Sequence, residues 1–103
     1  MRNIYFITVN FNNSDVTIDF VRSIEGLPTE HNVHIVIVDN NSKQEDFKKL
    51  KEKLQNTEKI KIVRSEINLG YFKGLNFGIR SINRKDEDLV VIGNNDLLFK
   101  ENF

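Results

Sequence analysis

Short runs of mostly apolar, β-branched residues constrain the fold of this chain more than any other feature. Such runs occupy Ile4–Val9, Val33–Val38, Ile60–Val63 and Leu89–Ile92, and the second and fourth are the most continuous. A strand with one solvated face alternates apolar and polar residues, whereas a strand covered on both faces is apolar throughout. We therefore expect four strands in a mostly parallel sheet that is flanked by helices.

Segments with helical spacing separate these predicted strands. Their apolar stripes are Val16, Phe20 and Ile24; Phe47, Leu50 and Leu54; and Phe72, Leu75, Ile79 and Ile82. Ser14 and Ser42 stand where the first two helices would take an N-cap. The resulting order is βαβαβαβ, which is typical of a Rossmann-like, doubly wound α/β sheet. In such sheets ligands bind beyond the carboxyl ends of the strands, near the point where the winding direction reverses.

Length and charge narrow the functional class. The chain has 103 residues, 15 basic and 15 acidic side chains and no cysteine. This length fits one domain, residues 1–103. Zero net charge argues against nucleic acid as a partner, and no apolar run approaches the roughly 20 residues of a transmembrane segment. The absence of cysteine excludes a disulfide framework, and a cytoplasmic location is expected.

Polar residues follow the second and fourth apolar runs directly. Asp39 comes directly after the second run, where a carboxylate can accept hydrogen bonds from a nucleoside or can cap the helix that begins near Ser42. Asn94, Asn95 and Asp96 follow the fourth run. One carboxylate with neighbouring amide oxygens suits a hard divalent cation, but the same residues also form ordinary polar turns. Both interpretations stay open at each position when the clusters are taken singly.

The first strand-to-helix loop and the third helical segment differ in their glycine content. The first strand-to-helix loop, residues 10–14, contains no glycine, which excludes a dinucleotide-binding G-x-G-x-x-G motif and a P-loop there. Gly70, Gly74 and Gly78 are spaced four residues apart in the third helical segment. We expect Gly74 and Gly78 to permit close helix packing and Gly70 to let the backbone approach a ligand.

Taken together and in this order, these clusters resemble the N-terminal, nucleotide-binding half of family-2 glycosyltransferases with the GT-A fold. The matching pieces are Val9-Asn10-Phe11-Asn12, Val38-Asp39-Asn40-Asn41-Ser42, Asn68-x-Gly70 with Asn76, and Asn94-Asn95-Asp96. The resemblance covers essentially the whole chain. It implies that a nucleotide-diphosphate-sugar donor contacts Val9, Phe11, Asn12, Asp39, Asn68, Gly70, Asn94 and Asn95.

The resemblance also implies a role for individual residues. Phe11 would lie against the base, where an aromatic face can stack on a pyrimidine. Asp39 would accept from the base imide N–H, which favours UDP or dTDP donors. Asp96 would bind Mg²⁺ or Mn²⁺ at the family's D-x-D position, although Asn94 replaces the first acid of that motif. The cation would stabilise the leaving nucleoside diphosphate.

The remaining expectations concern what lies outside these motifs. The family's catalytic base would come from beyond Phe103, so the chain is interpreted as a donor-binding portion, truncated after the D-x-D-like motif and inactive alone. A role in bacterial polysaccharide biosynthesis, at the inner face of the membrane in the full-length protein, follows by analogy. Strand four would lie at a sheet edge, and we expect a homo-oligomer formed across that edge or through the uncovered helix faces.

Two alternatives compete with the glycosyltransferase interpretation. The first is a non-catalytic interaction module of receiver-like topology, which is weakened because the loop after the first strand has no acidic residue before Asp15. The second is a folded piece that binds no nucleotide.

Overall fold

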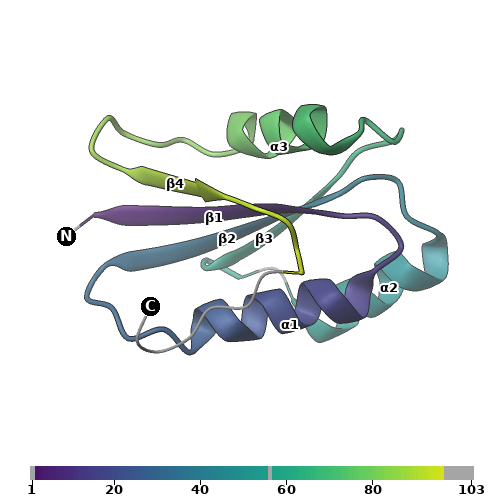
Figure 1. The fold of residues 1–103 in the computed structure, drawn as a ribbon, viewed down its shortest axis with the longest axis horizontal. Helices are drawn as coiled ribbons and strands as arrows, with labels where there is room; N and C mark the ends of the chain where they lie inside the picture. The colour runs from purple at the N-terminus through teal and green to yellow at the C-terminus, as the bar shows by residue number, and fades with distance from the viewer. Residues whose placement is uncertain (1, 56, 97–103) are drawn as a thin grey trace.

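The computed structural model describes residues 2–55 and 57–96, which form one parallel sheet between two layers of helix (Figure 1). In chain order the elements are β1 (Asn3–Asn10), α1 (Ser14–Glu25), β2 (Asn32–Asp39), α2 (Gln44–Lys53), β3 (Ile60–Arg64), α3 (Tyr71–Arg80) and β4 (Leu89–Ile92). The predicted βαβαβαβ order is confirmed, and each predicted strand is found within two residues of its expected bounds.

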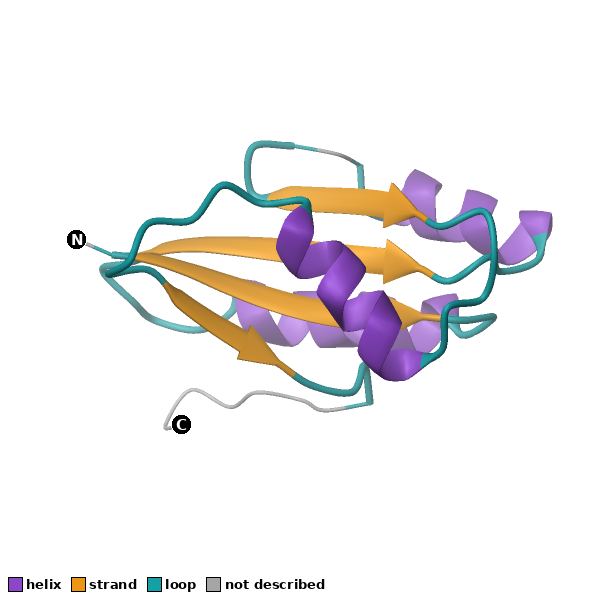
Figure 2. Cartoon of the chain, turned by 90° about the horizontal axis from the view of Figure 1, so that it is seen from above, coloured by secondary structure: helices purple, strands orange, loops and turns teal. Residues whose placement is uncertain are grey.

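The strand order is β3-β2-β1-β4, and every neighbouring pair is parallel. The chain adds β2 and β3 on one side of β1 and then returns through α3 to place β4 on the other side. Since parallel crossovers are right-handed, this reversal puts α3 on the face opposite α1 and α2 (Figures 1 and 2). The winding direction therefore changes between β1 and β4, as in a Rossmann-like GT-A half.

Apolar side chains fill both faces of the sheet. The larger cluster lies between the sheet and the α1–α2 layer and includes Phe20, Ile24 and Leu50, all at most 2% exposed. The smaller cluster lies under α3 around Ile7, Val36 and Leu75. Among the described residues, no helix is long and apolar enough to cross a membrane.

Close packing of α3 depends on two glycines, as predicted. A Cβ atom on Gly78 would lie 2.8 Å from methyl groups of Ile7 and of Val38. One on Gly74 would lie 3.1 Å from Val9. The helix thus rests directly on β1 and β2, and its N-terminal end lies toward the carboxyl ends of the strands (Figure 2).

Two burial predictions were wrong. β4 was expected to be covered on both faces, but Leu89, Val91 and Ile92 are 46%, 37% and 51% exposed. The reason is that β4 is an edge strand of the described sheet and α3 packs over β1 and β2 instead. Phe72 was assigned to the buried stripe of α3 but is 77% exposed, because the glycine face of the helix is the one that meets the sheet.

The predicted serine caps were also wrong. Neither α1 nor α2 has a side-chain hydrogen bond from its N-cap residue, Asn13 or Lys43. The backbone N–H of Ser14 donates instead to Asp46 Oδ1 at 3.0 Å, so a carboxylate from α2 serves the first turn of α1. The Ser42 hydroxyl accepts from the backbone N–H of Asn12 at 2.8 Å. Ser14 therefore joins α1 to α2, and Ser42 joins the loop after β2 to the loop after β1.

Candidate functional site

A cleft of about 370 Å³ opens at the carboxyl ends of β1 and β4, where the winding direction reverses. Loops from three parts of the chain form its walls: the segment after β1, the turn into α3 and the segment after β4. The lining residues are Val9, Phe11, Asn13, Asn68, Tyr71, Asn94, Asn95 and Asp96. Six of the nine residues predicted for the site from the sequence belong to this lining, namely Val9, Phe11, Asn68, Asn94, Asn95 and Asp96.

Two aromatic rings line this cleft. Phe11 follows β1 directly and is 48% exposed, which is high for a phenylalanine. Tyr71 is the first residue of α3 and is 36% exposed. Its ring meets that of Phe72 edge-on, with centroids 5.3 Å apart. Sequence reasoning missed Tyr71, although its place immediately after the Asn68-x-Gly70 turn could have indicated it.

The polar side of the cleft is the segment after β4. The Thr8 hydroxyl donates to the Gly93 carbonyl at 2.8 Å, and Gly93 N–H donates to the Ile7 carbonyl at 3.3 Å, so β1 holds the base of this segment. Farther along, Asn95 Nδ2 donates to the Thr17 hydroxyl of α1 at 2.8 Å. These contacts fix the segment that carries Asp96.

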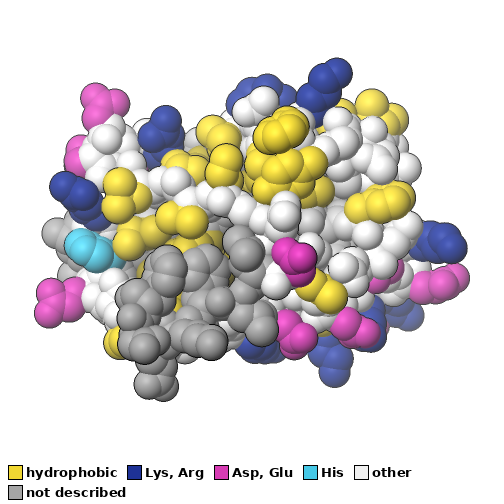
Figure 3. All heavy atoms as spheres, in the orientation of Figure 1, with side chains coloured by type: hydrophobic (Ala, Val, Ile, Leu, Met, Phe, Trp, Pro, Cys, Tyr) yellow, Lys and Arg dark blue, Asp and Glu magenta, His cyan; other side chains and the backbone are white. Residues whose placement is uncertain are grey.

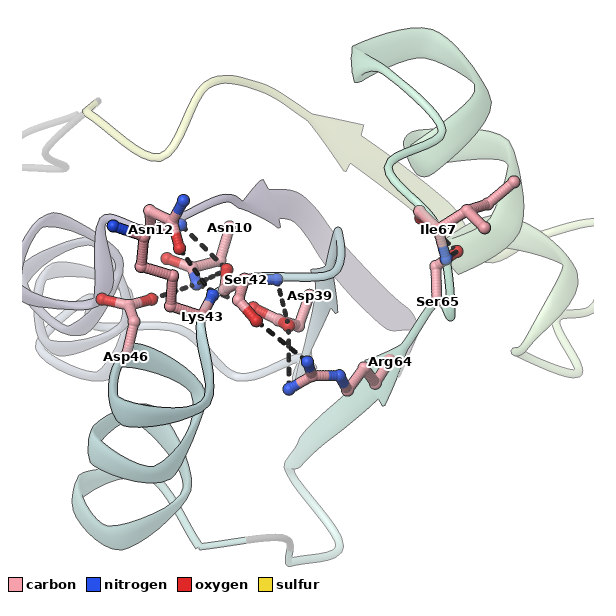
Figure 4. A network of polar contacts seen from close by, with 9 residues as sticks. All are labelled: Asn10, Asn12, Asp39, Ser42, Lys43, Asp46, Arg64, Ser65 and Ile67. Atoms are coloured by element: carbon pink, nitrogen blue, oxygen red, sulfur yellow. Dashed lines mark hydrogen bonds and ion pairs between the residues drawn. The ribbon is translucent and has the colours of Figure 1, made fainter.

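Asp39, in contrast, does not reach the cleft. Its carboxylate has no exposed surface and accepts from Asn10 Nδ2 at 2.9 Å and from the Ser42 backbone N–H at 3.1 Å (Figure 4). Arg64 Nη1 lies 3.6 Å from Asp39 Oδ2. The structure thus places Asp39 in a loop-capping role, and a direct contact with a base stays a prediction.

Asp46 closes this buried polar network from α2. It accepts from Asn10 Nδ2 at 3.0 Å, and its side chain stands across from Asp39 in Figure 4. Burial by itself raises the pKa of Asp46, but hydrogen bonds from Asn10 and Ser14 and the charge of Lys49 outweigh burial and hold that pKa below 3.8. The network therefore contains an ionised carboxylate on α2 that faces the Asn10 amide.

The sequence profile described as glycosyl transferase family 2 matches residues 5–103, which is nearly the whole chain. The chain belongs to this family. No curated protein matches the chain. The family agrees with the parallel sheet and with a cleft at its reversal point, and it implies a nucleotide-sugar donor and an acceptor for this glycosyltransferase domain.

Two further predicted residues lie beside the cleft of the glycosyltransferase domain rather than in its lining. Asn12 adopts a left-handed backbone, with φ of 52°, and its Oδ1 accepts from the Lys43 backbone N–H at 2.7 Å. Gly70 precedes α3 with φ of 78° and ψ of 177°, a conformation open essentially to glycine alone. The Asn40 side chain clamps this turn, accepting from Leu69 N–H and donating to the Gly70 carbonyl.

The cleft residues could hold a divalent cation only together with ligands from a bound donor. Of the described residues that line the cleft, Asp96 is the single carboxylate, and Asn94 and Asn95 add amide groups. Among the described residues, no three His, Cys, Asp or Glu side chains gather in a metal-binding cluster. Mg²⁺ is commonly bound by one or two carboxylates together with substrate phosphates, so a shared protein–donor site fits and a closed protein cage does not.

A larger cavity of about 550 Å³ lies at the opposite end of the sheet, near the starts of β2 and β3, and includes His31 and His34 in its walls. We place the site of the glycosyltransferase domain in the smaller cleft. Ligands of open α/β sheets bind at the carboxyl ends of the strands, and that is where the predicted residues converge.

Proposed function

We propose that this family-2 glycosyltransferase domain binds a UDP-sugar or dTDP-sugar in the cleft between β1 and β4, together with Mg²⁺ or Mn²⁺, for sugar transfer to an acceptor. The observation that carries the proposal is the meeting of Phe11 with Asn94, Asn95 and Asp96 in one cleft at the reversal point. The sequence separates these residues by more than 80 positions.

The aromatic wall supports binding of a base. Phe11, in the loop after β1, and Tyr71, the first residue of α3, are both exposed at the cleft, and a planar base can lie against either ring. Stacking on one aromatic side chain contributes about 1–3 kcal/mol per base. The choice of a pyrimidine comes from the family resemblance alone, because Asp39, the residue to which it assigns the imide contact, is buried outside the cleft lining.

The opposite wall supports binding of the diphosphate and its cation. Asp96 would hold the cation, with Asn94 or Asn95 bonded to the ribose or to water on the metal. The cation, when bound, supplies a Lewis acid that stabilises negative charge on the leaving nucleoside diphosphate. Asp96 and the two asparagines would orient the donor so that its diphosphate lies beside the cation. Deprotonation of the acceptor hydroxyl by a catalytic base stays a prediction.

Thermal unfolding with nucleotides tests the binding proposal. UDP or dTDP with MnCl₂ should raise Tm, whereas ADP and GDP should have little effect. Ligand at 100 times its Kd stabilises by about 2.7 kcal/mol, or roughly 10–20 °C for a domain of this size. A folded sample whose Tm changes with none of these nucleotides would refute donor binding by this chain.

Two substitutions localise the effect. Asp96→Ala should remove the contribution of Mn²⁺ to the Tm shift and leave part of the UDP contribution. Asp19→Ala is a matched control because Asp19 is an exposed carboxylate on α1, outside the cleft lining. Equal loss in both variants would indicate a general charge effect and contradict the assignment of Asp96.

Self-association is part of the proposal for the same domain. The edge strand β4 exposes Leu89, Val91 and Ile92, and hydrophobic side chains gather on that side of the molecule, with charges of both signs around them (Figure 3). An unpaired apolar edge favours strand pairing between copies. Light scattering at rising concentration should detect a dimer, and Val91→Lys should suppress it; a monomer at all concentrations would count against the idea.

A further inference from the structure

We propose that Thr17 is a positioning residue that turns the carboxamide oxygen of Asn95 toward the donor cleft. The inference rests on the proposed function, because it assigns Asn95 an oxygen rather than an NH₂ group at the place where donor and cation would bind. It is carried by a chain of hydrogen bonds that runs from Asn95 through Thr17 and Asn10 to two carboxylates.

The two carboxylates determine the donor-to-acceptor direction of these hydrogen bonds. Asn10 Nδ2 donates to Asp39 Oδ1 at 2.9 Å and to Asp46 Oδ2 at 3.0 Å (Figure 4). An ionised carboxylate only accepts hydrogen bonds, so the NH₂ group of Asn10 has to face them. Its carbonyl oxygen is thereby turned toward α1. The opposite amide orientation would set an oxygen against two carboxylates in a buried site.

Thr17 links the amide orientation of Asn10 to that of Asn95. Its hydroxyl donates to Asn10 Oδ1 at 2.6 Å, and the side chain of Thr17 has no exposed surface. A hydroxyl has one hydrogen, which the Asn10 oxygen uses. Toward Asn95 the Thr17 oxygen can therefore only accept.

Asn95 is oriented as the last member of the chain. Its Nδ2 donates to Thr17 Oγ1 at 2.8 Å. Within residues 2–55 and 57–96 no hydrogen bond to Asn95 Oδ1 is found, and Asn95 lines the cleft beside Asp96. Its oxygen is thus the atom offered to the cleft. Amide oxygens are ligands of hard cations and accept from ribose hydroxyls, whereas an NH₂ group can do neither.

Matched substitutions in the 103-residue chain separate this role from a purely structural one. Thr17→Val keeps the shape but removes the hydroxyl, and Thr17→Ser keeps the hydroxyl. Titration calorimetry with UDP and MnCl₂ should give an affinity lower by roughly 10- to 100-fold in T17V, as for other residues that orient metal ligands, and near wild type in T17S. With EDTA in place of MnCl₂, equal UDP affinity in all three proteins would place the Asn95 oxygen on the cation, whereas a loss that persists in T17V would place it on the ribose.

A readout without nucleotide keeps this inference apart from the proposed function. In ¹H–¹⁵N spectra the side-chain NH₂ of Asn95 should be slow to exchange with water in wild type and T17S, and fast in T17V. Unchanged Asn95 exchange in a folded T17V protein would overturn the inference, whether or not UDP binds. If wild type binds no UDP, the proposed function fails while this measurement still decides the role of Thr17. Thr17→Ala serves for the same test if T17V does not fold.

Discussion

Asn10 and Asp39 are register partners at the carboxyl ends of β1 and β2, and a hydrogen bond of 2.9 Å joins Asn10 Nδ2 to Asp39 Oδ1. Neither residue has exposed surface. Arg64 holds the next place in the same row, as the partner of Asp39 on β3. An amide, a carboxylate and a guanidinium thus form a row across the carboxyl ends of β1, β2 and β3, next to the loops that form the cleft.

Removing the Asn10 side chain should destabilise the fold. Asn10→Ala leaves Thr17, Asp39 and Asp46 without a shared partner in a buried site, and each unsatisfied group costs about 1–3 kcal/mol. With partial rearrangement we expect a loss of roughly 2–4 kcal/mol in the free energy of unfolding, measured by urea denaturation. Asn83→Ala, at an exposed position after α3, is the control and should change little. Equal effects would contradict the importance of the network.

Filling the glycine face of α3 should separate the helix from the sheet. In Gly78→Ala the new methyl group would lie 2.8 Å from carbons of Ile7 and Val38, and such overpacking costs about 1–3 kcal/mol. The better helix propensity of alanine offsets about 1 kcal/mol of this loss. Thermal unfolding should therefore show a net decrease in Tm.

Gly26→Ala is the matched control for that experiment. Gly26 ends α1 in a helical conformation, with φ of −83°, and the nearest atoms to an added Cβ lie 3.8 Å away. Alanine fits there without strain and should leave Tm unchanged or raise it slightly. A Gly78→Ala protein as stable as the Gly26→Ala protein would show that α3 can shift away from β1 and β2.

Much of the fold follows from the sequence because continuous β-branched runs and helical stripes are local signals. The strand order places β4 at the edge, as expected, but the exposure of Val91 depends on where α3 settles, which no local pattern encodes. The cleft residues from Phe11 to Asp96 were predictable, since polar loops after parallel strands share one edge. Tyr71 was missed although it stands directly after the Asn68-x-Gly70 turn. Thr17 was not predictable, because its role arises from contacts between segments far apart in the chain.

The same reasoning explains why Asp39 was hard to assign. Its position after a strand fits both a nucleoside contact and a loop cap, and only its neighbours distinguish the two. Asn10 and Arg64 become its neighbours through strand register, which the sequence does not specify. Buried polar groups of this kind are therefore the least predictable part of the site.

Acid should weaken the fold through Asp46. Hydrogen bonds from Asn10 and Ser14, opposed by burial, hold the pKa of Asp46 below 3.8 in the folded state. Because the folded pKa is the lower one, its stabilising contribution is complete above about pH 4 and is lost as the pH falls through the folded value. Urea unfolding from pH 7 to pH 2.5 should show this decline. Asp46→Asn should be less stable at pH 7 and lose less on acidification; an unchanged acid dependence would contradict the assignment.

Asp88 should add to that decline from the other end of the sheet. The backbone N–H of Lys85, at 2.8 Å, and the backbone and side chain of Asn3 lower the pKa of Asp88. These bonds join the start of β1 to the turn before β4, so protonation should loosen the edge strand first. The protection factors of β4 amides against hydrogen exchange should fall below pH 4 in wild type, and in Asp88→Asn they should be low already at neutral pH.

The aromatic wall should decide affinity for the base. Phe11→Ala removes a ring that is 48% exposed at the cleft, so it should weaken UDP binding by about 1–3 kcal/mol, while Phe11→Tyr keeps the stacking face and should bind like wild type. Tyr71→Ala should weaken binding as well if the base lies between the two rings. Ile67→Ala is the control, because Ile67 is 63% exposed but does not line the cleft. Calorimetry that finds equal affinity in F11A and I67A would place the base elsewhere, whereas loss in F11A and Y71A alone would locate it between β1 and the start of α3.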